Sequence, residues 1–193
     1  MPRTEVFDRA EVLTNCRNAF WAGGYHGTSM QDLVDSSGLN RSSIYNSFGS
    51  KLELYLLCLE EQIKIERNRF DRASQQQRNG IETIGLLFLF TMEEQLTDET
   101  RRGCLLLNSW TEMANHEEVV RTLLSTQRRR AEGQFRKWVQ KGQEDRSITT
   151  LDSMEEISYQ IMNAYQGFKI SIMQTPNPKI LKQIVQRLLK SIT

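Results

Sequence analysis

A row of hydrogen-bonding side chains between residues 41 and 47 has the residue types and spacing best suited to recognising another molecule. The segment reads Arg-Ser-Ser-Ile-Tyr-Asn-Ser. Ile44 and Phe48 stand four residues apart, the spacing of neighbours on one face of a helix. The side chains left for the opposite surface are Arg41, Ser42, Ser43, Tyr45 and Asn46. Short polar groups with one Arg match the edges of DNA bases and the phosphates, so this segment is a candidate DNA-reading helix.

A second group with reactive potential is Cys104, which follows Arg101, Arg102 and a glycine at the predicted start of a helix. A helix N-terminus and neighbouring Arg side chains both lower the pKa of a thiol and favour the reactive thiolate. The alternative interpretation is a small cysteine packed in the core. Cys16 and Cys58 lie on apolar helix faces, which predicts inert thiols.

No metal site, disulfide framework or catalytic centre is predicted. The three cysteines are odd in number and far apart, and His26 and His116 have no second ligand at helical spacing. The sequence shows no paired carboxylates, no nucleophile with a base and no phosphate-binding loop. We therefore expect neither catalytic residues nor a cofactor.

Helix-start signals surround the candidate DNA-reading helix. Two have the spacing of capping boxes: Thr28 with Gln31 and Ser50 with Glu53. Asn40 is a good N-cap residue, and Gly38 can take the positive φ that ends the preceding helix. The pattern predicts a short helix, a glycine turn, a second short helix and then a long one, with a further helix over residues 4–22 behind them. Two short helices joined by a glycine turn form the helix-turn-helix unit, whose second helix enters the DNA major groove.

Several stretches of this region follow one another in a familiar order. They are Gly-Tyr-His-Gly-Thr-Ser-Met-Gln-Asp-Leu at residues 24–33, Ser-Gly-Leu at 37–39, Ser-Ile-Tyr at 43–45, Phe48, and Ser-Lys at 50–51. Together they resemble the DNA-binding segment of the tetracycline-repressor (TetR/AcrR) family of bacterial regulators. The resemblance implies an all-α fold of about nine helices. It further implies an N-terminal three-helix head with the helix-turn-helix over residues 1–50, and a helical ligand-binding and dimerisation body over residues 51–193.

The resemblance also suggests how DNA would be held. Tyr45 near the end of the reading helix and Lys51 at the start of the next helix are expected to contact phosphates. Thr28 and Ser29 lie at a helix start, where backbone N–H groups can hold a phosphate, although capping alone would also explain them. The remaining candidates, for base edges or phosphates, are Arg41, Ser42, Ser43 and Asn46.

Beyond the head, helical periodicity predicts helices over residues 51–74, 81–96, 104–114, 117–142 and 152–174, and another from Pro178 onward. In the resembled family such a body encloses a pocket for a small, often apolar ligand, which soft and aromatic side chains suit. The candidate lining residues are Phe88, Met92, Cys104, Trp110, Met113 and Tyr165. Each of them could equally be plain core.

The last two predicted helices carry apolar stripes that must be buried somewhere. In the resembled family such a pair meets its copy in a four-helix dimer interface. The candidate interface residues are Ile157, Ile161, Phe168, Ile184 and Leu188. The alternative is that the stripes pack within their own chain, but a two-fold dimer also suits helix-turn-helix recognition of DNA.

Composition limits how such a protein could bind and where. The 193 residues include 25 Lys and Arg against 24 Asp and Glu, so a net charge of +1 gives no general attraction to nucleic acid. Charges also balance within the first 51 residues, unlike the basic surface typical of a DNA-binding head. No apolar stretch is long enough to span a bilayer, and the charged start does not resemble a signal peptide. A soluble protein in the reducing cytoplasm, with no membrane partner, is therefore expected.

These features predict a homodimeric, ligand-responsive transcriptional regulator, most simply a repressor. A small-molecule inducer would release it from a palindromic double-stranded DNA operator. One alternative replaces the ligand pocket with chemistry at Cys104, which would sense electrophiles or oxidants. Another is a protein-interaction module that has lost DNA binding, which the neutral head permits. An enzyme has no support in the sequence.

Overall fold

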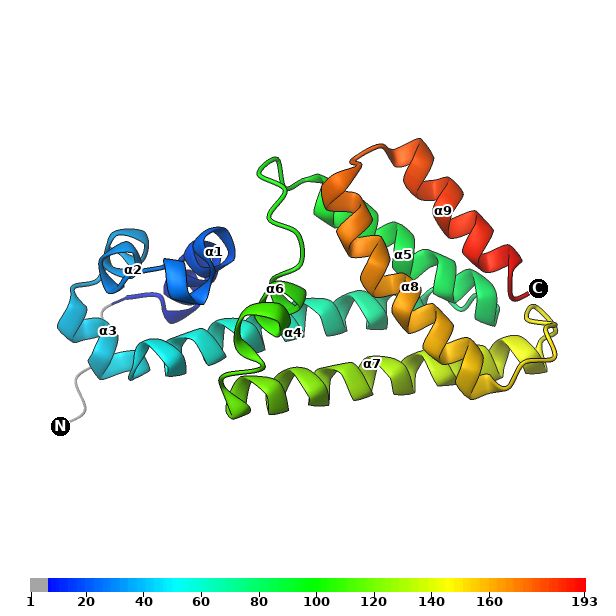
Figure 1. The fold of residues 1–193 in the computed structure, drawn as a ribbon, viewed down its shortest axis with the longest axis horizontal. Coiled ribbons are helices and arrows are strands. Elements are labelled where there is room, and N and C mark those ends of the chain that lie inside the picture. Colours follow the sequence, from blue (N-terminus) through cyan, green and yellow to red (C-terminus); the bar gives the residue numbers. More distant parts are fainter. Residues whose placement is uncertain (1–6) are drawn as a thin grey trace. The chain divides into compact units, whose positions relative to one another are not determined.

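The computed structural model describes residues 7–193, which form nine helices (Figure 1). Their bounds are α1 Arg9–Gly27, α2 Met30–Ser37, α3 Arg41–Phe48, α4 Lys51–Gln75, α5 Gly80–Leu96, α6 Leu105–Met113, α7 Glu118–Glu144, α8 Met154–Gln174 and α9 Pro178–Lys190. The all-α prediction is confirmed. From α2 onward the predicted ends lie close to the observed ones, because capping residues and helical periodicity are local signals.

The first helix differs from its prediction over residues 4–22. Asp8 is the N-cap residue and accepts the backbone N–H of Ala10 at 2.9 Å, so α1 begins at Arg9. Residues 4–6 of the predicted range lie outside the described part of the chain. Gly24 takes φ 72° and ψ 173°, which interrupts the helix where a glycine break was expected. A further helical turn then runs on to Gly27.

The described chain divides into two compact units. The first, here called the head unit, comprises the residues up to Lys64 together with residues 105–122. The second, the body unit, comprises residues 65–104 and 123–193. This division by packing differs from the expected functional boundary after residue 50, because α4 contributes to both units and α6 packs with α1. The functional division remains a prediction.

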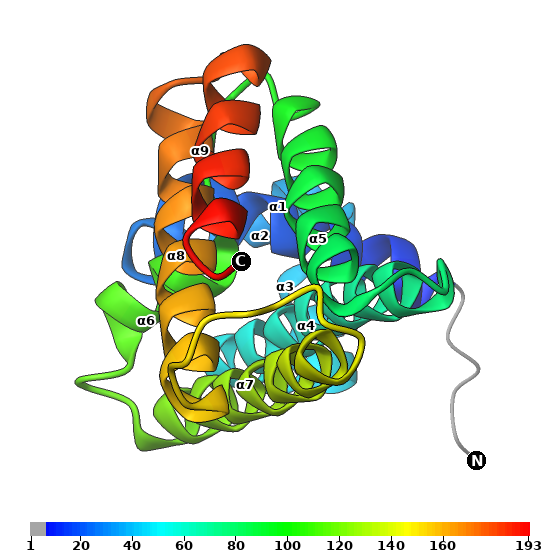
Figure 2. The same ribbon diagram turned by 90° about the vertical axis from the view of Figure 1, so that its right-hand side faces the viewer.

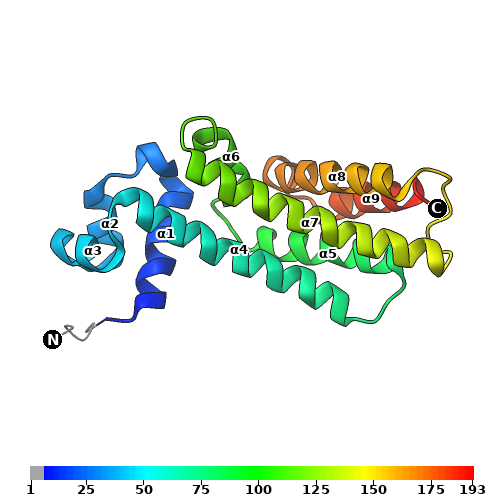
Figure 3. The same cartoon turned by 90° about the horizontal axis from the view of Figure 1, so that it is seen from below.

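In the head unit, α1 packs against α2, and α2 against α3 (Figure 3). The core is formed by Phe20 of α1, Leu33 of α2, Ile44 of α3 and Tyr55 of α4, all almost completely buried. The edge of the Phe20 ring meets Tyr55, with centroids 4.9 Å apart. Leu33 on α2 and Ile44 on α3 thus determine which face of each short helix points inward.

In the body unit, α5 packs against both α8 and α9, which also contact each other (Figure 2). Aromatic rings fill the interior: Tyr165 of α8 lies with its ring centroid 5.3 Å from Phe88 and 5.8 Å from Phe135. At the start of α5, Gly80 is needed for space, because a Cβ there would stand 2.3 Å from the backbone of Gly142. In residues 7–193 no helix is both long and apolar enough to cross a membrane.

Candidate functional site

The first helix of the helix-turn-helix, α2, begins at a capping serine and ends at a glycine. Ser29 is the N-cap residue of α2: its hydroxyl accepts the backbone N–H of Asp32 at 3.2 Å, and the Asp32 carboxylate accepts the Ser29 N–H at 2.7 Å. At the other end Gly38 takes φ 70° and donates its N–H to Val34 at 3.0 Å. The left-handed conformation costs glycine little, which allows the sharp turn toward α3.

The capping box predicted for Thr28 and Gln31 is wrong by one residue. The Thr28 side chain is buried, and its hydroxyl donates to the Gly24 carbonyl at 2.6 Å. That hydrogen bond joins Thr28 to the point where α1 is interrupted, so Ser29 rather than Thr28 caps α2. The Ser29 side chain therefore stays at the exposed helix start, whereas the Thr28 hydroxyl is turned inward. The second predicted box is confirmed, because Ser50 and Glu53 exchange hydrogen bonds of 2.7 and 3.2 Å.

The DNA-reading candidate α3 presents its polar residues outward. Asn40 caps it by accepting the Ser43 N–H at 2.9 Å. Ile44 and Phe48 are buried, as their spacing predicted. The exposed side chains are Arg41, Ser42, Tyr45 and Asn46, with Ser43 half-buried. Tyr45, the predicted phosphate contact on this helix, has 46% of its surface exposed.

Two side chains that were not among the predicted DNA contacts, Arg9 and Tyr25, lie against residues at the end of α3 and the start of α4. The Arg9 guanidinium lies 4.4 Å from the centre of the Phe48 ring and donates to the Ser47 carbonyl at 3.0 Å, so α1 holds the end of α3. The Lys51 ammonium lies 4.4 Å from the centre of the Tyr25 ring. The electron-rich face of an aromatic ring attracts a cation, so the Tyr25 ring restrains the position of the Lys51 ammonium.

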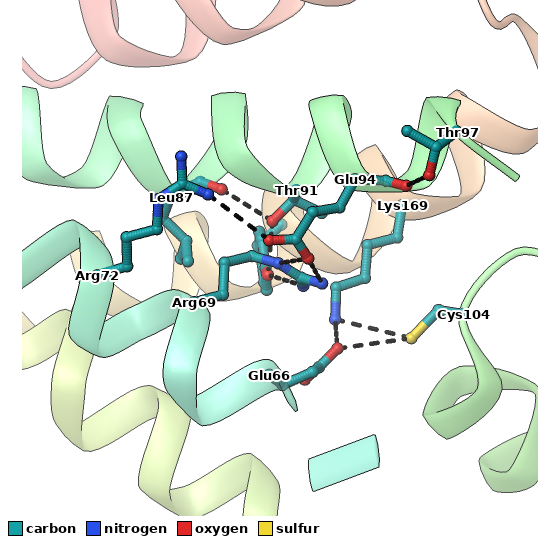
Figure 4. Close-up of polar contacts among 10 residues, drawn as sticks. Glu66, Arg69, Arg72, Leu87, Thr91, Glu94, Thr97, Cys104 and Lys169 are labelled. Atoms are coloured by element: carbon teal, nitrogen blue, oxygen red, sulfur yellow. Dashed lines mark hydrogen bonds and ion pairs between the residues drawn. The ribbon is translucent and has the colours of Figure 1, made fainter. Parts of the chain in front are cut away.

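The body unit contains a buried polar cluster, formed by Glu66, Arg69, Thr91, Cys104, Tyr165 and Lys169, with the half-exposed Glu94 at its edge (Figure 4). The Lys169 ammonium pairs with the Glu66 carboxylate and also donates to the Cys104 sulfur at 3.7 Å. The Cys104 sulfur in turn lies 3.8 Å from the Glu66 carboxylate. The sulfur can therefore donate its proton to Glu66 as a thiol or accept from Lys169 as a thiolate.

The cluster contains a second cation, Arg69, which pairs with the Glu94 carboxylate. Arg69 donates through Nε to Glu94 at 2.8 Å, and Tyr165 and Thr91 share a hydrogen bond of 2.9 Å.

Burial of Lys169 opposes its charge, but Cys104 and Glu66 together hold its pKa above the usual value. Burial is the largest effect on Glu66 and raises its pKa, but the charges of Lys169 and Arg69, with the hydrogen bonds from Lys169 and Cys104, together outweigh burial and lower the pKa of that carboxyl. The pair is thus charged in the folded protein.

The other two thiols have different surroundings. Burial raises the pKa of Cys16 to about 11, against a weaker effect of Ser36. Burial also raises the pKa of Cys58, whose sulfur donates to the Leu13 carbonyl at 3.7 Å. Both thiols are held in the protonated, unreactive form at neutral pH. Among the described residues, no group of three or more His, Cys, Asp or Glu side chains could hold a metal ion.

The residues predicted to line a ligand pocket belong to both units. Phe88, Met92 and Tyr165 lie in the aromatic core of the body unit. Met113 is fully buried in the head unit, where Trp110 has 37% of its surface exposed. The first three are packed as core, the alternative that the sequence left open.

Three of the five predicted dimer residues are buried in their own chain. Ile157, Ile161 and Phe168 belong to the body core, because the α8 stripe that carries them faces α5 and α9. Ile184 is exposed and Leu188 half-buried on α9. The name α8–α9 outer face is used here for seven exposed residues of these two helices: Tyr159, Asn163, Gly167, Ile170, Met173, Ile180 and Ile184.

The sequence matches models of two known protein families. A family model described as bacterial regulatory proteins of the tetR family matches residues 13–58. A second, described as the tetracyclin repressor-like C-terminal domain, matches residues 80–188. The two matches together span both the helix-turn-helix and the helices that carry the buried polar cluster.

Individual relatives agree with the family models. An uncharacterized HTH-type transcriptional regulator of Bacillus subtilis, YezE, is 27% identical over 135 residues, 70% of each chain. The Escherichia coli transcriptional repressor ComR is 26% identical over 125 residues, 64% of this chain and 60% of ComR. A cysteine mutant of the TetR family regulator CifR, solved with 26-bp double-strand operator DNA, is 26% identical. It superimposes with a TM-score of 0.85 over 99% of this chain and 100% of CifR.

Proposed function

Because this chain belongs to the TetR family of bacterial regulatory proteins and is a DNA-binding transcriptional regulator, we propose that it is a homodimeric repressor of a palindromic operator. The observation that carries the proposal is α3, a capped helix with two buried apolar anchors and an exposed polar surface. Such a helix presents donors and acceptors to base edges while its position is fixed by the head core. Its place of action would be the cytoplasm, where the chromosomal DNA lies.

The proposed dimer is supported by the α8–α9 outer face. Ile170 and Met173 on α8 and Ile184 on α9 expose apolar side chains at helical spacing. Gly167 lies among them, and a Cβ there would meet nothing within 4 Å, which leaves room for another helix. A two-fold dimer would carry two copies of α3, and two copies of α3 require a symmetric DNA site.

We propose release from the operator by a small-molecule inducer that binds the body. An inducer acts by preferring the conformation that does not bind DNA, and a hundredfold preference corresponds to about 2.7 kcal/mol.

A second candidate signal is modification of Cys104 by an electrophile or oxidant. What favours it is the Lys169 ammonium at the Cys104 sulfur, because an adjacent ammonium stabilises a thiolate and here acts against the opposite effect of the Glu66 carboxylate. Cys104 also immediately precedes α6, which belongs to the head unit. A group added to this sulfur would therefore act on the segment that leads into a helix of the head.

The proposed function is tested by selecting binding sites from random double-stranded DNA with the full chain. We expect enrichment of one palindrome, with two half-sites separated by about one helical turn or a multiple of it. Footprinting should then show two protected major grooves. Enrichment of no sequence, with retention of DNA no better than a neutral control protein, would instead favour an interaction module that has lost DNA binding.

A further inference from the structure

A carboxylate from α6 accepts hydrogen bonds from the segment that leads into the helix-turn-helix. Glu112 accepts the backbone N–H of Tyr25 at 3.0 Å and that of His26 at 2.8 Å. The partners are 87 and 86 residues apart in sequence, yet all lie in the head unit. A carboxylate that accepts two backbone N–H groups fixes both the position and the direction of the segment that donates them.

The neighbouring glycine shows how closely Glu112 approaches. Gly24 has φ 72°, and a Cβ built on it would stand 2.9 Å from one Glu112 carboxylate oxygen and 3.0 Å from the other. Any larger residue would therefore be strained in its backbone and would also displace the carboxylate. The chain accommodates Glu112 at the point where α1 is interrupted.

Tyr25, whose backbone donates to Glu112, also contacts the candidate DNA contact Lys51 through its ring. The Tyr25 ring lies 4.4 Å from the Lys51 ammonium on one side and 4.9 Å, centre to centre, from the Tyr55 ring. Tyr55 is itself tied to α6, because its hydroxyl and that of Ser109 lie 2.7 Å apart in a buried hydrogen bond. One helix, α6, thus contacts both the backbone of Tyr25 and the hydroxyl of Tyr55, whose ring lies next to that of Tyr25.

We propose that Glu112 and Tyr25 are positioning residues for operator binding. Glu112 sets the turn that leads to Ser29, the N-cap residue of α2, and the Tyr25 ring holds the Lys51 ammonium in the direction of a DNA phosphate. The inference rests on the proposed phosphate role of Lys51. It explains how a head without excess positive charge binds DNA: its cation is oriented in advance, so less conformational freedom is lost on binding.

The first test removes the carboxylate. In the full chain, Glu112→Ala should weaken operator binding at least roughly tenfold at a temperature where it is fully folded, because two charge-assisted hydrogen bonds are lost. Glu112→Gln, which keeps one acceptor oxygen, should show a smaller loss. Amide hydrogen exchange at Tyr25 and His26 should accelerate in both variants. The matched control is Glu118→Gln, since the Glu118 side chain is 85% exposed and pairs with Arg121 of its own helix.

The second test asks whether Tyr25 acts through Lys51. Tyr25→Leu should weaken operator binding and lower its salt dependence in the wild-type background, but should have little further effect once Lys51→Ala is present. Tyr25→Phe keeps the ring and should bind within about twofold of the wild type.

Three outcomes overturn the proposal. One is wild-type operator affinity in folded Glu112→Ala and Glu112→Gln, even with lowered melting temperatures, since these residues would then be purely structural. Another is full additivity of Tyr25→Leu and Lys51→Ala. The third is rapid amide exchange at Tyr25 and His26 already in the wild type. A wild-type chain that binds no DNA refutes the proposed function instead, so the two failures are distinguishable.

Discussion

The Lys169 ammonium donates to the Cys104 sulfur across 3.7 Å, although the two residues are 65 positions apart in the sequence. Both side chains are buried, and Glu66 supplies the counter-charge beside them. A cation at hydrogen-bond distance stabilises a thiolate over a thiol. Of the three cysteines, Cys104 is therefore the one that we expect to react at neutral pH.

Replacement of Cys104 tests this expectation. Cys104→Ser should bind operator like the wild type but remain bound after treatment with a small alkylating agent such as iodoacetamide, which should release the wild type. The physical reason is that the serine hydroxyl is not ionised at neutral pH and does not displace iodide. Gel shift with and without the reagent measures the difference.

Cys16→Ser and Cys58→Ser are the controls for this experiment. Burial holds both thiols in the protonated form, with a pKa of about 11 for Cys16. These variants should therefore still be released by alkylation. If Cys104→Ser is released as readily as the wild type, Cys104 is a structural residue and the inducer must bind elsewhere in the body.

The Glu66–Lys169 pair predicts a specific acid dependence of stability. Because Lys169, Arg69 and the hydrogen bonds to Glu66 together hold its pKa below the ordinary value of 4.5 against the effect of burial, the stabilisation from the charged carboxylate is complete above that value. It is lost as the pH falls below it, through the lowered pKa. Thermal unfolding of Glu66→Gln should therefore show a smaller decrease in melting temperature between about pH 5 and pH 3 than the wild type.

At pH 7 the same variant should be destabilised, on the order of 3 kcal/mol or more, because Lys169 stays buried without its carboxylate. The double variant Glu66→Gln with Lys169→Met removes both charges and should recover most of this loss. Equal stability of Glu66→Gln and the wild type at pH 7 would mean that the pair is not formed in solution.

The proposed phosphate contacts predict effects that do not depend on DNA sequence. Lys51→Ala should weaken binding of operator and of unrelated DNA by similar factors and reduce the salt slope by about one per protomer. Tyr45→Phe should weaken both DNAs a few-fold, since only one hydrogen bond is removed. Wild-type affinity in both variants would refute the assignment.

The base-reading candidates on α3 predict a different result. Arg41→Ala or Asn46→Ala should relax the preference for a particular base at one position of each half-site, at about 1–3 kcal/mol of lost discrimination. Site selection repeated with each variant identifies that position. An unchanged selected sequence would reassign the residue to a phosphate contact.

The α8–α9 outer face predicts where the dimer can be broken. Ile170→Glu combined with Ile184→Glu places two charges on exposed apolar positions of this face and should yield a folded monomer. Light scattering measures the mass, and circular dichroism the helix content. Gln75→Glu with Gln76→Glu adds the same charge at exposed positions near the end of α4 and should leave the dimer intact. A wild-type monomer at micromolar concentration would contradict the proposed dimer directly.

Sequence patterns determined the local architecture of this protein. Asn40, Gly38 and the Ser50–Glu53 pair act within three or four residues of their partners, so their roles as caps and turns could be predicted without a fold. Ile44 and Phe48 are buried for the same reason. The helix-turn-helix, the outward polar surface of α3 and the family resemblance follow from these short-range signals.

Tertiary structure decided everything that depends on distant residues. Thr28 and Ser29 have equivalent local signals, and the contact of Thr28 with Gly24 decided that Ser29 is the cap. The apolar stripes of α8 and α9 required burial, but their periodicity could not say whether their own chain or a partner would cover them. Packing against α5 and α9 buried Ile157, Ile161 and Phe168.

The partners of the polar groups that could carry regulation could not be predicted from the sequence either. Lys169 meets Glu66 from 103 residues away, and Glu112 meets Tyr25 from 87. Such pairs form because a buried charge or backbone N–H group must be satisfied by whatever side chain the packed helices bring near it. Helical periodicity specifies which face of a helix is apolar, but only the folded chain determines which distant partner that face meets.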